Sequence, residues 1–98
     1  MTLTNYISTT DDLEVRFKEY DIPIVRRLSN GVEFEFDDEY NIVGFILPNF
    51  CQMIHRQYPP NTIFQYSHTI FDENHATVVI QVNNQPIKVK IDLSELDK

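Results

Sequence analysis

Two runs of alternating apolar residues, 76–82 and 85–91, are separated by only two asparagines, and this arrangement constrains the fold more than any other feature of the chain. Asparagine tolerates the positive φ angles of a two-residue type I′ turn, so the segment predicts a β-hairpin. So short a loop also sets the strand register. The register places most of the apolar residues on one face, in the pairs Val82 with Gln85, Ile80 with Ile87, Val78 with Val89, and Ala76 with Ile91.

Other alternating segments predict further antiparallel strands. The expected strands are 22–28, 32–36, 42–47 and 62–71, with 37–41 as the turn between the middle pair. The first of these contains a proline and is therefore expected at a sheet edge. Segment 62–71 precedes the asparagine hairpin and completes a three-stranded meander with it. Its alternation places one set of side chains on the same face: Phe64, Tyr66, His68 and Ile70. Strand 42–47 is apolar on both faces, which favours a covering helix, loop or second subunit.

One short helix is expected at residues 49–58, where apolar side chains recur at helical spacing between Pro48 and Pro59. Residues 11–20 fit either a strand or a capped helix, and we favour the strand. The predicted fold class is α+β: a small antiparallel β-sheet of about five or six strands, with one short helix packed on it, in a single domain spanning 1–98.

Composition narrows the classes of function. The chain has 98 residues, 42% of them hydrophobic, and a formal net charge of −7. A folded domain is expected, and nucleic-acid binding is disfavoured because an acidic chain repels the phosphate backbone. Cys51 is the single cysteine, and no stretch resembles a signal peptide or a membrane helix, so we expect a cytoplasmic protein with no membrane association.

The most distinctive cluster of charge is a run of five carboxylates within seven residues, at the expected 32–36 strand and the turn after it. No Lys or Arg occurs between residues 28 and 55. Carboxylates at every second strand position share one face and could bind a basic surface, although a solvated strand face has the same pattern. The candidate partner-binding residues are Glu33, Glu35, Asp37, Asp38, Glu39 and Tyr40.

Residues 11 to 50 resemble a small prokaryotic family, domain of unknown function 2283. The resemblance rests on Asp12-Leu-Glu-Val15 and on Asn30-Gly-Val-Glu-Phe-Glu-Phe-Asp-Asp-Glu-Tyr-Asn-Ile-Val-Gly-Phe-Ile-Leu47. Members of that family carry a turn glycine where this chain has Tyr40. The resemblance implies a compact, β-rich bacterial protein of the cell interior and assigns no catalytic residue.

Other constellations of reactive residues are less specific. His68, Asp72, Glu73 and His75 match no zinc spacing, and we expect no metal site and no cofactor. Cys51 and His55 are one helical turn apart, but no oxyanion-hole motif or orienting partner accompanies them. Two glycines are too few for a phosphate-binding loop. We therefore expect no catalytic residues.

The sequence favours a non-catalytic protein–protein interaction module of the inhibitor, antitoxin or immunity type, which binds a basic protein through the acidic hairpin face. The alternative is a ligand-binding or catalytic domain with a pocket between sheet and helix, near Cys51, His55 and Tyr66. A homodimer is expected because so small a chain leaves apolar surface to cover.

Overall fold

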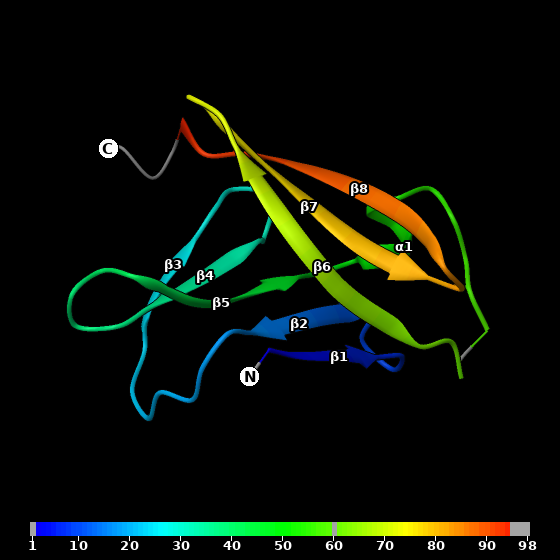
Figure 1. Cartoon of the computed structure of the whole chain (residues 1–98), viewed down its shortest axis with the longest axis horizontal. Coiled ribbons are helices and arrows are strands. Elements are labelled where there is room, and N and C mark those ends of the chain that lie inside the picture. The colour runs from blue at the N-terminus through cyan, green and yellow to red at the C-terminus, as the bar shows by residue number, and fades with distance from the viewer. Residues whose placement is uncertain (1, 60, 95–98) are drawn as a thin grey trace. The chain divides into compact units, whose positions relative to one another are not determined.

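The computed structural model describes residues 2–59 and 61–94 (Figure 1). Within these ranges the chain forms eight strands in two sheets and a single turn of helix. The backbone contacts divide it into two compact units, with the boundary between Phe50 and Cys51. The described residues thus form an α+β fold of antiparallel sheets, but the expectation of one sheet with five or six strands was wrong.

The first unit is a five-stranded antiparallel sheet with the strand order β1-β2-β5-β4-β3. Its strands are β1 (Leu3–Ile7), β2 (Asp12–Arg16), β3 (Ile24–Arg27), β4 (Glu33–Phe36) and β5 (Ile42–Leu47). The ambiguous segment 11–20 therefore contains a strand, as favoured above. Strand β3 lies at a sheet edge directly after Pro23. This position was expected, because proline has no backbone N–H to donate to a neighbouring strand.

The core of this sheet lies on one face and follows directly from the alternation in the sequence. The register aligns Val15, Phe45 and Phe34 across three neighbouring strands, and all three side chains are buried. The rings of Phe34 and Phe45 are 6.2 Å apart between centroids. Burying each such side chain stabilises the fold by about 1.5–3 kcal/mol relative to leaving it exposed.

Strand β5, which is central, contains Gly44 because a larger residue would not fit there. A Cβ atom on Gly44 would lie 2.7 Å from the backbone oxygen of Val15 and 3.2 Å from the Glu35 carboxylate. The register also shifts at the neighbouring Glu35/Phe36 step of β4, where Phe36 pairs with Ile42. This irregularity occurs just before the 37–41 turn, so it orients the acidic turn relative to the sheet.

The second unit contains the meander β6-β7-β8, as expected. Its strands are β6 (Phe64–Phe71), β7 (His75–Val82) and β8 (Gln85–Asp92). All four pairs expected for the asparagine hairpin are present in the register of β7 and β8. Asn83 and Asn84 have φ angles of 52° and 64°, which are those of a type I′ turn.

Strand β6 departs from the expected alternation because it contains a β-bulge at Ser67. Tyr66 pairs with Ile80, but the next pair is His68 with Val79, so the side chains exchange faces. His68 and Ile70 therefore lie on the opposite face from Phe64 and Tyr66. The prediction that these four residues share one face was wrong. Side chains of a regular strand alternate between the two faces, and the extra residue of a bulge reverses that alternation for the rest of the strand.

Helix α1 (Phe50–Met53) is much shorter than the expected helix at 49–58. His55 has a φ angle of 57°, and its N–H donates to the Gln52 carbonyl oxygen while the Arg56 N–H donates to that of Cys51. This pattern ends a helix in the left-handed conformation, so the chain turns away before Pro59. Among the described residues, no helix is long and apolar enough to cross a membrane.

Candidate functional site

The acidic residues of the β4 hairpin divide into three structural groups. Glu33 and Glu35 lie on the face of the five-stranded sheet opposite the buried Phe34, and both are half-buried. The Glu33 carboxylate lies 3.1 Å from the guanidinium of Arg27 on the neighbouring strand. Glu35 is aligned with Gly44 and, one strand further, with Arg16. An ion pair with Arg27 thus offsets the charge of Glu33, while Glu35 shares its face of the sheet with Arg16.

Asp37 forms the second group, because its side chain is buried rather than solvated. Only 6% of the residue is exposed. One carboxylate oxygen accepts the N–H groups of Glu39 and Asn41 at 2.9 Å each, and the other accepts the ammonium of Lys18 at 3.0 Å. The backbone hydrogen bond from Asn41, and then the bond from Lys18, lower the pKa of Asp37 below its ordinary value. Asp37 therefore shapes the turn and is not available to a partner.

Asp38, Glu39 and Tyr40 form the third group, at the exposed tip of the turn. Tyr40 has a φ angle of 63°, donates its N–H to the Asp37 carbonyl oxygen, and leaves 68% of its surface exposed. Its ring packs at 6.5 Å from that of Phe36. The left-handed conformation at Tyr40 is the one that a turn glycine adopts without strain.

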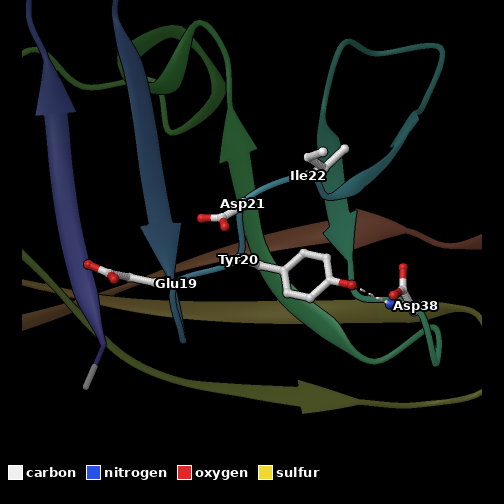
Figure 2. A pocket seen from close by; sticks show the side chains of 5 residues that line it. All are labelled: Glu19, Tyr20, Asp21, Ile22 and Asp38. Carbon is white, nitrogen blue, oxygen red and sulfur yellow. Dashed lines mark hydrogen bonds between the residues drawn. The ribbon is translucent and has the colours of Figure 1, made fainter.

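The structure brings a second acidic segment to this turn, namely the β2–β3 connection. Glu19, Tyr20, Asp21 and Ile22 line an open hollow of about 660 Å³ together with Asp38. The Asp38 N–H donates to the Tyr20 hydroxyl oxygen at 3.1 Å, and Figure 2 shows the Tyr20 ring extending from the connection to this contact. We call Glu19, Asp21, Asp38 and Glu39, with Tyr20 and Ile22, the acidic end of the sheet.

The carboxylates of the acidic end diverge. In Figure 2, Glu19 and Asp21 leave the connection on the side away from the Tyr20 ring, whereas Asp38 lies at the end of that ring. Among the described residues, no three side chains of metal-binding type are grouped so that they could hold a metal ion. Divergent carboxylates spread a negative potential over a surface and do not enclose one small ion.

The aromatic and aliphatic members of the acidic end determine how it can be recognised. Hydrogen bonding with the Asp38 side chain is the main factor that raises the pKa of the Tyr20 phenol, which stays neutral near pH 7. The Lys18 ammonium lies 5.9 Å from the centre of the Tyr20 ring and is already bound to Asp37. Ile22 is 82% exposed. The acidic end therefore presents negative charge beside an apolar side chain and an aromatic ring.

Glu19 and Asp21 were not among the expected site residues. They are 17 or more positions from Asp38 in the sequence, so only the tertiary fold brings them to the turn. The burial of Asp37, by contrast, had a local signal. An aspartate followed by a polar turn readily accepts backbone N–H groups from residues further along that turn.

The other sequence candidates occupy ordinary structural positions. Asp72 accepts the N–H groups of Asn74 and His75 in the β6–β7 turn, and these bonds lower the pKa of Asp72. The His75 ring nitrogen lies 3.5 Å from the same carboxylate, whereas His68 is exposed on the far side of the bulge. Cys51 lies in α1, and His55 is exposed beyond the end of that helix.

Comparison of the chain with protein-family models, with curated proteins and with solved structures finds no match. The resemblance of residues 11–50 to domain of unknown function 2283 therefore stays a prediction, and the function has to be argued from the geometry of the site.

Proposed function

We propose that this chain is a non-catalytic interaction module that binds a basic protein surface through the acidic end of its five-stranded sheet. The observation that carries the proposal is the open hollow lined by Glu19, Asp21 and Asp38 beside the exposed Ile22. An inhibitor, antitoxin or immunity protein of the cytoplasm would use such a surface against a basic partner. Complementary charge gives an interface its specificity and its association rate.

Charge compensation inside the sheet supports the choice of the acidic end over the strand face. A partner that binds Glu33 has to compete with Arg27, which already lies 3.1 Å from that carboxylate. Asp38 and Glu39 are exposed at the turn, and Lys18, the cation that reaches this turn, is engaged by Asp37. The negative charge open to a partner is therefore concentrated at the turn and the β2–β3 connection.

Exposed apolar surface beside the charge supports a protein as the ligand. Long-range attraction between charges accelerates encounter, but affinity comes mainly from apolar and aromatic anchors near the centre of an interface. Ile22 and Tyr40 are 82% and 68% exposed and lie in the two segments that carry the acidic residues. A basic partner with an apolar depression at its centre would match this arrangement.

The test is affinity capture of the tagged protein from its native lysate, at low and at high salt, with two charge-reversal variants. The Glu19→Lys/Asp38→Lys variant alters the acidic end, and the Glu33→Lys/Glu35→Lys variant, with the same change of charge, is the matched control on the strand face. Circular dichroism establishes that both variants are folded. Titration of the captured partner against each purified variant then measures affinity.

We expect a partner that is retained at low salt and released at high salt. The acidic-end variant should bind it at least about tenfold more weakly, while the control keeps most of its affinity. Equal binding by the wild type and the acidic-end variant would contradict the proposal. Loss confined to the Glu33/Glu35 variant would move the site to the strand face.

A further inference from the structure

Strand β6 is an outer strand of the three-stranded sheet and carries neither a charged side chain nor a proline, so the bulge at Ser67 is its one protective feature. Outer strands present unpaired backbone groups, and proteins guard them with charges, prolines, bulges or short length. In this chain β3 follows Pro23 and carries two arginines, β8 contains Pro86 and two lysines, and β1 has only five residues. Strand β6 has eight residues and contains no Asp, Glu, Lys or Arg.

Exposed apolar side chains lie in the same strand and directly before it. Ile63, Ile70 and Phe71 are 75%, 55% and 58% exposed. They are three of the seven exposed large apolar residues in the described part of the chain. A concentration of exposed apolar residues on an edge without charges or prolines marks a surface that can pair with another strand.

The bulge makes the face pattern of β6 symmetrical about its own centre. Pairing with β7 places Phe64, Tyr66, Thr69 and Phe71 on the face of Val78 and Ile80, and Gln65, His68 and Ile70 on the other face. When the strand is reversed end to end, Phe64 coincides with Phe71, Gln65 with Ile70, and Tyr66 with Thr69. Each position then meets one that points to the same face.

This symmetry fits a second copy of the same strand. A two-fold axis perpendicular to the sheet keeps each face on its own side, so an antiparallel partner has to match faces at every pair. The reversed β6 satisfies this condition, with the two Ser67 bulges beside the axis. In a strand without a bulge, the faces of paired residues match only if the two-fold axis passes through one residue, which then pairs with its own copy.

Charge also favours a second copy here. The chain carries a net charge of −7, so two copies repel each other over most of their surface. Residues 57–71 contain no formally charged side chain, and β6 is therefore an outer strand at which two acidic chains can approach without placing like charges opposite each other.

We propose that the protein forms a homodimer by antiparallel pairing of β6 with β6 of a second copy, which joins the two meanders into one six-stranded sheet. The pairs across the two-fold axis are Phe64 with Phe71, Gln65 with Ile70, and Tyr66 with Thr69. This interface shares no residue with the acidic end and does not depend on the proposed function.

The first test is analytical ultracentrifugation of the full chain over a range of concentrations. We expect a species of twice the 11.6 kDa chain mass, in equilibrium with the monomer. Ile70→Lys places a charge on the exposed strand and should weaken the dimer at least about tenfold. Ile22→Lys is the matched control, because it makes the same exchange at an exposed isoleucine of the other unit.

The proposal is overturned if the wild type stays monomeric up to about 1 mM, the weakest affinity relevant here. It is equally overturned if both variants weaken the dimer alike or if folded Ile70→Lys dimerises as the wild type does. Gln65→Lys replaces Ile70→Lys should that variant fail to fold, since Gln65 is also exposed.

A cross-link tests the register itself. In a Cys51→Ser background, Ser67→Cys places thiols beside the two-fold axis, within the range that a disulfide spans. Mild oxidation should convert this variant to a covalent dimer, while the control Gln85→Cys, on the edge strand β8, stays monomeric. Failure of Ser67→Cys to cross-link, in a preparation that is dimeric, would overturn pairing through β6.

Discussion

The carboxylate of Asp37 accepts hydrogen bonds from Glu39, Asn41 and Lys18, which belong to two separate segments of the chain. Asp37→Ala removes all three bonds and leaves two backbone N–H groups of the turn without their acceptor. We expect it to lower the midpoint of thermal unfolding clearly more than Asp37→Asn, which keeps an acceptor oxygen. Asp38→Ala, at the exposed neighbour, is the control and should change the midpoint least.

The same carboxylate predicts a dependence of stability on pH. The pKa of Asp37 is lowered in the folded chain, so its contribution is fully present above the ordinary aspartate pKa of about 3.9. It is lost as the pH falls through the lowered folded value. The difference in midpoint between wild type and Asp37→Ala should therefore be constant near pH 7 and shrink below about pH 4. A difference that grows on acidification would contradict this assignment.

Gly44 offers a test of packing at the centre of the sheet. Gly44→Ala brings a Cβ atom to 2.7 Å from the Val15 carbonyl oxygen, and the two strands have to separate to accept it. We expect a loss of about 1–3 kcal/mol in the free energy of unfolding, measured by urea denaturation. Adding Glu35→Ala relieves only the side-chain contact, so full recovery in the double variant would show that the backbone contact is unimportant.

Single residues were predictable where their role is local. The sequence located all five acidic residues of the hairpin, but alternation alone placed Asp37 on the solvated face with Glu33 and Glu35. The polar turn that follows Asp37 gave a local signal for its backbone bonds, but the contact with Lys18, which is 19 positions away, had none. Glu19 was missed for the same reason, since its proximity to Asp38 arises from the tertiary fold.

Among the elements, the β7–β8 hairpin provides the clearest prediction. Asn84 has a φ angle of 64°, which costs a β-branched residue about 1–2 kcal/mol. We expect Asn84→Val to destabilise the protein by about that amount, and Asn84→Gly to leave its stability unchanged or slightly higher. Equilibrium unfolding of the two variants checks this, and equal stability of Asn84→Val and wild type would rule out a strained turn position.

Elements were predictable to the extent that local sequence sets their geometry. The asparagine turn and its flanking alternation specify register without reference to the rest of the chain, and the structure has that register. The end of α1 is set by a left-handed backbone at His55, where the sequence has no glycine or asparagine to mark the end, so the prolines further on were mistaken for the stop signal. The bulge at Ser67 likewise contains no glycine from which it could be predicted.

At the scale of the whole molecule, the division into two sheets was the main feature that local patterns did not predict. Alternation shows that a segment is a strand but does not say which strand it joins. Strand β1 was overlooked because the sequence Leu3-Thr-Asn-Tyr-Ile7 alternates only weakly. Strand β2 pairs with both β1 and β5, and the first sheet is complete without any strand from the second unit.

The net charge of −7 predicts a further property of the whole molecule. If the acidic end serves binding, its charges oppose the folded state through mutual repulsion. Glu19→Gln/Asp38→Asn/Glu39→Gln should therefore keep or raise the midpoint of thermal unfolding at low salt. The increase should vanish near about 1 M salt, where charges are screened beyond about 3 Å.

Glu33→Gln is the control for this comparison, because it removes a charge that Arg27 already balances. It should give no increase in the midpoint at any salt concentration. A lower midpoint for the triple variant at low salt would mean that the acidic end stabilises the fold. In that case the stability of the fold would account for the charge of the acidic end, and no partner would be needed to explain it.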